Sequence, residues 1–135
     1  MKVVVKLVQF KDFDFQKVVD FLNSHEGCQV LNASFFVGEK QVLHAVNEMK
    51  KAFENGCNFA SSEELEFLVR FLGERQIKRA VEKAKPGVRS LFVSWKGVRN
   101  YRDFEEEFEF KVLKFPRVKE KELKAAMEKT AAFWI

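Results

Sequence analysis

The sequence predicts an α+β fold, with a single mixed, largely antiparallel sheet of about four strands covered by about five helices. Strand-like segments and helical spacing patterns follow one another in the order strand, helix, strand, three helices, strand, strand, helix. The three consecutive helical patterns form a central insertion, which interrupts any regular doubly wound order. At 135 residues, without a linker or a repeat, the chain is expected to form a single domain over 1–135.

The first third of the chain alternates between the two kinds of pattern. Lys2 to Phe10 is rich in valine and predicts a buried strand. Asp12 or Asp14 can cap a helix whose apolar residues at 15, 18, 19 and 22 share one face. Cys28 to Val37 then predicts a second strand, which Gly38 ends.

Three helices are expected in the middle of the chain. The first covers Glu39 to Glu54 and is stopped by Asn55-Gly56. The second begins with Ser61 and Glu64, which have the spacing of a capping box, and ends at Gly73. The third buries residues 77, 80, 81 and 84 and closes at Pro86-Gly87.

The last third returns to strands. Val88 to Trp95 predicts a third strand, and Phe108 to Phe115 alternates apolar and charged residues as a fourth. The pattern over 99–107 does not decide between a loop and a helical turn. A last helix is expected from Lys119 to about Thr130. Most of the 16 phenylalanines are expected to pack in the core.

Composition and motifs argue against a membrane protein and against an enzyme. No apolar run approaches the roughly 20 residues that span a bilayer, and the N-terminal segment lacks a secretory core, so a cytoplasmic location is expected. Cys28 and Cys57 have no metal-ligand spacing and are expected to be buried free thiols. His44 has no visible nucleophile beside it, and no glycine-rich phosphate loop occurs. The acidic run 105–107 is expected to be a solvated edge, so we predict no catalytic residue, metal, cofactor or small-molecule substrate.

Positive charge is concentrated in one block. Residues 75–102 contain nine Lys or Arg and one acidic residue, a net +8, whereas the whole chain carries +4. The rest of the chain therefore sums to −4. Such a block favours an anionic partner, although a solvated cationic face that only aids solubility is the alternative.

The step into the third central helix is the candidate site. A helix start presents unpaired N–H groups and partial positive charge, which suit a phosphate. The guanidinium of Arg75 adds charge, and the amide of Gln76 is able to read a base edge or a ribose. The predicted nucleic-acid-binding residues are Arg75, Gln76, Lys78, Arg79 and Lys83, with Gly73 and Ile77 as structural residues of the motif.

The same region resembles a known family. The segments that carry the resemblance are Asn58-x-Ala60, Glu64-Leu65, Gly73-x-Arg75-Gln76-Ile77 followed by Ala80, and the preceding helix with Gln41, His44, Ala45 and Ala52. They look like the kinase-binding small subunit of the KEOPS complex, the PRPK-binding protein family. The likeness covers most of the chain and is strongest from Glu39 to Ala84, and the compact length suits an archaeal member.

The resemblance implies a function. KEOPS installs threonylcarbamoyl on the adenosine next to the anticodon of tRNAs that read codons starting with A. This subunit is implied to be non-catalytic, to bind the small atypical kinase/ATPase subunit, and to capture tRNA through its single-stranded 3′ CCA end. The implied roles carry over most directly to Gly73, Arg75, Gln76 and Ile77.

A duplex-DNA regulator is the alternative. Glu64 to Ala84 would then be a helix-turn-helix whose recognition helix carries Arg75, Lys78 and Arg79. The surrounding strands, and a glycine turn that looks shorter than in most such motifs, argue against it. A small enzyme is the third possibility, disfavoured by the missing motifs.

The end of the chain provides a second candidate surface. Phe133, Trp134 and Ile135 are three large apolar residues at a terminus, where polar residues are usual. We predict that part of this tail forms the centre of the kinase interface, because aromatic and aliphatic anchors are typical hot spots. Burial in the chain's own core is the alternative.

Overall fold

The computed structural model describes residues 2–131 and confirms the α+β class, with one four-stranded sheet and six α-helices. The sheet is antiparallel throughout, and three of the helices are inserted between its second and third strands, as predicted. The elements are β1 (Val4–Phe10), α1 (Phe15–Asn23), β2 (Cys28–Asn32), α2 (Glu39–Glu54), α3 (Glu63–Leu72), α4 (Ile77–Ala84), β3 (Arg89–Ser94), α5 (Arg99–Glu107), β4 (Phe110–Leu113) and α6 (Glu120–Ala131).

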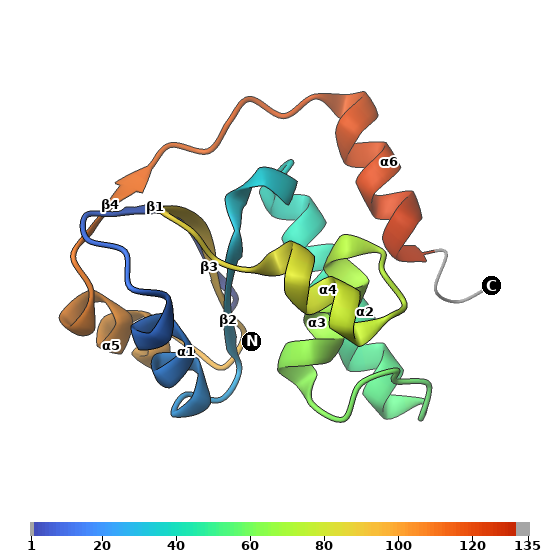
Figure 1. The fold of residues 1–135 in the computed structure, drawn as a ribbon. Helices are drawn as coiled ribbons and strands as arrows, with labels where there is room; N and C mark the ends of the chain where they lie inside the picture. The colour runs from blue at the N-terminus through green and yellow to red at the C-terminus, as the bar shows by residue number, and fades with distance from the viewer. Residues whose placement is uncertain (1, 132–135) are drawn as a thin grey trace. The chain divides into compact units, whose positions relative to one another are not determined.

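The chain divides into two compact units (Figure 1). The sheet unit consists of Met1–Ser34 and Lys85–Phe115, and therefore holds all four strands with α1 and α5. The helical unit consists of Phe35–Ala84 and Pro116–Ile135 and holds α2, α3, α4 and α6.

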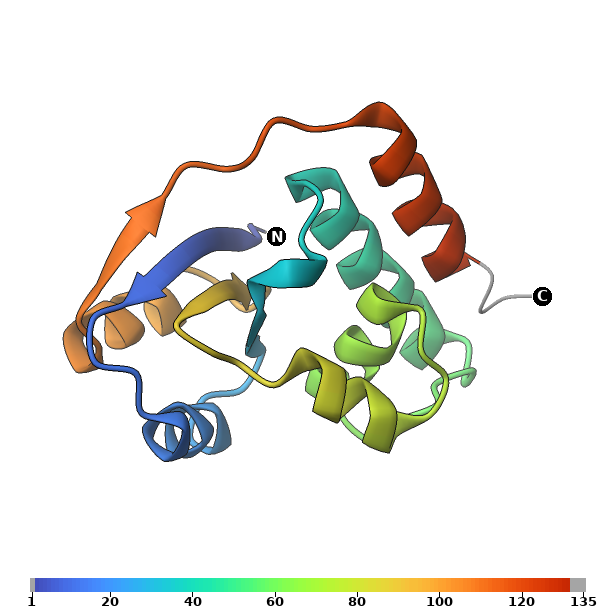
Figure 2. The same cartoon turned by 45° about the horizontal axis from the view of Figure 1, so that its top comes forward.

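In the sheet unit the strand order is β2-β3-β1-β4, so β2 and β4 are the edges. Both α1 and α5 lie on the same face of the sheet (Figures 1 and 2). Phenylalanine fills the space between them. The ring of Phe104 on α5 lies 4.6 Å from that of Phe92 on β3 and 5.5 Å from that of Phe21 on α1. These three side chains are almost fully buried, which is the packing role expected for most of the phenylalanines.

In the helical unit the inward faces follow the predicted spacing. Val42, Ala45 and Met49 of α2 are fully buried, and Phe67 and Phe71 of α3 stack with ring centroids 5.6 Å apart. The exception is α4, where Ala80 and Ala84 are buried but Val81, expected to point inward, is 46% exposed. At about 100° per residue, Val81 lies at the edge of the stripe that Ala80 and Ala84 define.

All four strands are shorter than predicted, and for β2 and β4 a local hydrogen bond gives the reason. β2 ends at Asn32 rather than Val37, because the Asn32 side-chain oxygen accepts a hydrogen bond of 2.9 Å from the Ser34 amide. This turn leads into a 3-10 helix over Ala33–Phe35. β4 begins at Phe110 rather than Phe108, since the Phe108 amide still donates to the Phe104 carbonyl at 3.0 Å and so closes α5.

The helix boundaries also differ in part from the prediction. Asp14 caps α1 as expected, accepting from the Lys17 amide. The cap of α3 is Ser62 rather than Ser61, and its hydroxyl accepts from the Leu65 amide. Because Leu65 cannot return a hydrogen bond, the predicted capping box does not form. Residues 99–107, left open between loop and turn, form the nine-residue helix α5.

Candidate nucleic-acid interface

The candidate site begins at the turn between α3 and α4. Gly73 adopts a left-handed conformation with φ of +64°, which confirms it as the residue that ends α3. Its amide donates to the Arg70 carbonyl, and the Glu74 amide donates to that of Val69 at 3.0 Å, as in a Schellman closure. The side chain of Lys129 from α6 covers the space that a Cβ at position 73 would take. The turn is therefore held by α6 as well as by its own backbone.

The start of α4 already holds an anion, and that anion is Glu74. Its carboxylate accepts hydrogen bonds from the Gln76 amide at 3.2 Å and from the Lys83 ammonium at 3.1 Å. The Gln76 amide first, and the Lys83 ammonium next, lower the pKa of Glu74 below its usual range. The prediction of unpaired N–H groups at this helix start is wrong for the Gln76 amide.

The structure places all five predicted binding residues on the surface of the helical unit, on one turn and one helix. Arg75, Gln76, Lys78, Arg79 and Lys83 are exposed. Ile77 is half-buried, in keeping with its expected structural role. The two lysines differ in their surroundings. Lys83 forms an ion pair with Glu74, whereas Lys78 lies on another side of the short helix.

The basic block is divided between the two compact units. Residues 75–84 belong to the helical unit, and residues 85–102 belong to the sheet unit. The candidate site therefore consists of the residues around α4, and the second half of the block is not counted in it.

A buried ion pair supports the loop that precedes α3, and sequence reasoning missed it. The Glu66 carboxylate accepts from the amides of Phe59 and Ala60 at 2.7 and 2.8 Å, and from the Arg70 side chain at 2.8 Å. Arg70 also donates to the Cys57 carbonyl at 3.3 Å. The Glu-x-x-x-Arg spacing was visible in the sequence, but nothing there showed that both side chains are fully buried. Asn58 and Ala60, which the family resemblance singled out, lie in this loop, where Asn58 donates to the Ala60 carbonyl.

His25 has polar neighbours that the sequence did not reveal. In the sheet unit its Nε2 lies 3.1 Å from an Asp103 oxygen, and its Nδ1 lies 3.0 Å from the Ser24 hydroxyl. This resembles a nucleophile, a base and an orienting acid. Nδ1, however, also lies 2.8 Å from the Phe21 carbonyl, and the Ser24 hydroxyl donates to that same carbonyl at 3.0 Å. Both side chains are therefore engaged with the backbone at the end of α1, and the cluster ties the end of α1 to α5 through Asp103.

His44 lies in a shallow cavity of about 680 Å³ between α2 and α6 of the helical unit. The charged residues around it are Lys40, Glu120, Lys121, Lys124 and Glu128, with Leu123 and Met127 as the apolar part. This lining contains no serine, threonine or cysteine that the imidazole would activate.

Four further expectations concern the cysteines, metal ligands, membrane-spanning helices and the C-terminal tail. Cys28 is a buried free thiol as predicted, whereas Cys57 is exposed. Within residues 2–131, no three Cys, His, Asp or Glu side chains come together as metal ligands, and no helix is long and apolar enough to cross a bilayer. Phe133, Trp134 and Ile135 lie outside the described residues.

The fold and the site together define an α+β protein with an exposed basic helix start in its helical unit. The sequence matches no protein-family model, and none of the curated proteins matches it. The relation to the KEOPS subunit therefore stays a prediction made from the residues quoted above.

Proposed function

We propose that this chain is a non-catalytic subunit of a cytoplasmic KEOPS complex for tRNA threonylcarbamoyladenosine modification, which binds the kinase/ATPase subunit and the 3′ CCA end of tRNA. One observation supports the RNA-binding part most directly. Around a single helix start, Arg75, Lys78 and Arg79 are exposed together with the amide side chain of Gln76. Cationic side chains bind phosphates, and an amide reads the edge of an unpaired base.

Glu74 refines how the RNA would be bound. Because this carboxylate already accepts from the Gln76 amide and from Lys83, a phosphate at the same place would meet a negative charge. The phosphates are therefore assigned to the side chains of Arg75, Lys78 and Arg79. Lys83 contributes through its positive charge and by holding Glu74 in place.

The direct test measures binding of a short single-stranded RNA that ends in CCA. Charge reversal by Arg75→Glu is expected to weaken binding about tenfold or more, while kinase binding is unchanged. The matched control is Arg117→Glu, which makes the same change of charge at another exposed position of the helical unit. Affinity should fall with salt at a slope of roughly −0.7 per phosphate neutralised. If removal of the CCA end changes nothing, the site assignment is wrong.

A helix-turn-helix remains the second candidate, and one observation favours it. The connection between Leu72 and Ile77 is four residues long and contains Gly73, which fits the turn of such motifs. The turn is therefore not shorter than in such motifs, contrary to the prediction. A competition between CCA-ended RNA, blunt RNA and duplex DNA separates the two functions, because a DNA regulator would prefer the duplex.

The kinase-binding part of the proposal rests on the apolar end of the chain. Trp134→Ala combined with Ile135→Glu is expected to abolish co-purification with the kinase subunit while CCA-ended RNA is still bound. A large loss of thermal stability in this variant would instead place the tail in the chain's own core. The purified chain alone is expected neither to hydrolyse ATP nor to transfer a group.

A further inference from the structure

The outer edge of β4 in the sheet unit is open. The Lys11 amide donates to the Glu109 carbonyl at 3.0 Å, which makes these two residues a hydrogen-bonded pair of the ladder between β1 and β4. Since hydrogen-bonded and non-bonded pairs alternate in an antiparallel ladder, the N–H and C=O groups of Phe110 and Val112 point away from β1. Among residues 2–131 no strand pairs with that side of β4. These backbone groups are available to another strand.

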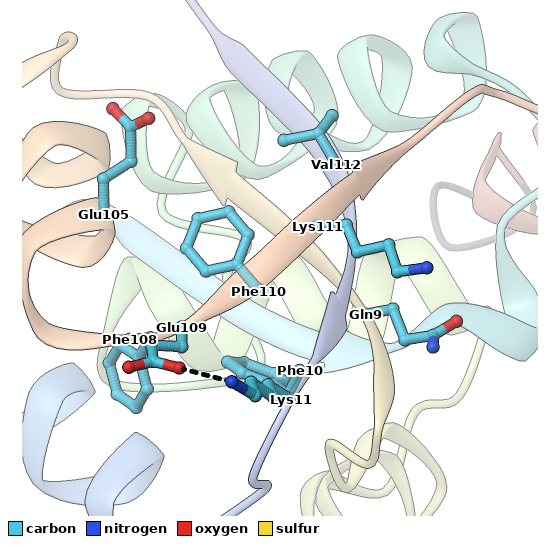
Figure 3. A pocket seen from close by; sticks show the side chains of 9 residues that line it. All are labelled: Gln9, Phe10, Lys11, Glu105, Phe108, Glu109, Phe110, Lys111 and Val112. Carbon is cyan, nitrogen blue, oxygen red and sulfur yellow. Dashed lines mark ion pairs between the residues drawn. The ribbon is translucent and has the colours of Figure 1, made fainter.

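The two faces of this edge differ in character. Residues of β4, of the end of β1 and of α5 line a cavity of about 770 Å³ at this edge (Figure 3). Phe110 and Val112 extend from one face of β4, whereas Lys111 extends from the other. Val112 is 52% exposed. Glu109 shares the charged face and forms an ion pair of 3.6 Å with Lys11.

This edge is complementary to itself. An antiparallel pair of two β4 strands, centred on Phe110, sets Glu109 of each copy opposite Lys111 of the other. Opposite charges in such cross-strand positions stabilise a strand pair. On the apolar face, Phe110 meets its own counterpart, and the exposed Val112 lies across the ladder from the backbone of the buried Phe108. A pair centred on Lys111 instead would set two lysines opposite each other, which disfavours that register.

We propose that a second copy of this chain docks on β4, joining the two sheets into one antiparallel sheet through the register centred on Phe110. Phe110 of the two copies exchanges N–H···O hydrogen bonds, and the Val112 amide donates to the Phe108 carbonyl of the second copy. The strand is only four residues long, so the interface is smaller than the roughly 1,200 Å² typical of stable complexes. The assembly is therefore concentration-dependent. It involves the sheet unit only and does not depend on the proposed RNA-binding function.

The test is sedimentation equilibrium of the full chain between about 10 µM and 1 mM, a range that suits weak interfaces. All variants carry Lys11→Gln as a common background. Without it, Glu109→Lys would place a lysine beside Lys11 on the neighbouring strand and destabilise the sheet itself. On this background Glu109→Lys and Lys111→Glu are each expected to weaken dimerisation about tenfold, since like charges then face each other. The double variant, with both changes, restores dimerisation to within about threefold of the background.

Hydrogen exchange identifies the edge directly. The amides of Phe110 and Val112 are expected to gain protection as concentration rises, while those of Lys111 and Leu113, which face β1, are protected at every concentration. Val112→Pro removes an outward N–H and leaves the ladder to β1 intact, so it should abolish the dimer without changing the thermal melt. A chain that is monomeric at 1 mM, a dimer that survives Val112→Pro, or a double variant as weak as the single ones would overturn the proposal.

Discussion

Two carboxylate–cation pairs flank the same glycine turn in the helical unit, and they have opposite environments. Glu66 and Arg70 lie before Gly73 and are fully buried, with 2.8 Å between oxygen and nitrogen. Glu74 and Lys83 lie after it, 3.1 Å apart, with side chains 16% and 47% exposed. Each pair joins a glutamate to a cationic side chain. Burial therefore decides how much each pair is expected to contribute to the stability of the chain.

The buried pair is structural because no part of it reaches solvent. Both Glu66 oxygens are used, one by the amides of Phe59 and Ala60 and the other by Arg70. A buried charge that loses its partner costs several kcal/mol of stability. The conformation of the loop 57–60 therefore depends on the intact pair. The second pair is partly exposed and therefore more weakly held, and its carboxylate lies where a phosphate of the proposed RNA partner would approach.

The largest effect is expected from Arg70→Met. Removing the cation leaves the Glu66 carboxylate buried without its charge partner, at a cost of about 3–5 kcal/mol in the free energy of unfolding. Urea unfolding measures it. The double variant Glu66→Gln with Arg70→Met removes both charges and keeps an oxygen for the two loop amides, so it should be more stable than Arg70→Met alone. Equal losses in the two variants would contradict the assigned role.

Gly73→Ala is expected to destabilise the chain by about 1–2 kcal/mol, because an L-residue is strained at a φ of +64°. The matched control is Gly56→Ala, at a φ of +68°, where nothing lies within 4 Å of the added Cβ. At Gly73 the added atom also meets the Lys129 side chain. The excess loss at Gly73 over Gly56, in parallel urea titrations, reports the contact of α6 with the turn. No excess would mean that α6 does not hold the turn.

Glu74→Gln is expected to raise the affinity for CCA-ended RNA about threefold, because a negative charge beside the phosphates is removed and Lys83 is released. Glu82→Gln on the same helix is the control, since it makes the same change of charge at an exposed position without the Lys83 contact. Fluorescence polarisation at fixed salt compares the two. Equal gains would show that only net charge matters, and a loss with Glu74→Gln would mean that the ion pair shapes the site.

The smallest effect is the pH dependence of stability that Glu74 contributes. The folded chain lowers the pKa of Glu74 below its unfolded value of about 4.5. The group therefore contributes stability that is complete above that pH and is lost as the pH falls through the folded pKa. The difference in Tm between the wild type and Glu74→Gln should be constant at neutral pH and should close in acid. A difference that persists unchanged at pH 3 would contradict the ionised pair.

Local patterns in the sequence determined the kinds of elements and most of their positions. The periodicity of apolar residues placed the four strands and the three central helices, because side-chain spacing follows from backbone geometry. Asp14 and Gly73 were identified for the same reason, since a helix cap and a left-handed stop depend on the residue itself. The five residues proposed as the binding site around α4 were chosen from spacing and charge alone, and the structure shows that their side chains are exposed.

Tertiary structure decided what each of these groups meets. The strand order, the open edge of β4 and the division into two units depend on contacts between distant segments, which periodicity does not encode. The amides of Phe59 and Ala60 find Glu66, and Lys83 finds Glu74 nine residues away, only after the chain has folded. Spacing places a side chain on a face, but burial and hydrogen-bond partners come from the other elements packed against it. For that reason the sequence revealed the cations of the candidate site and did not reveal the carboxylate already held at its helix start.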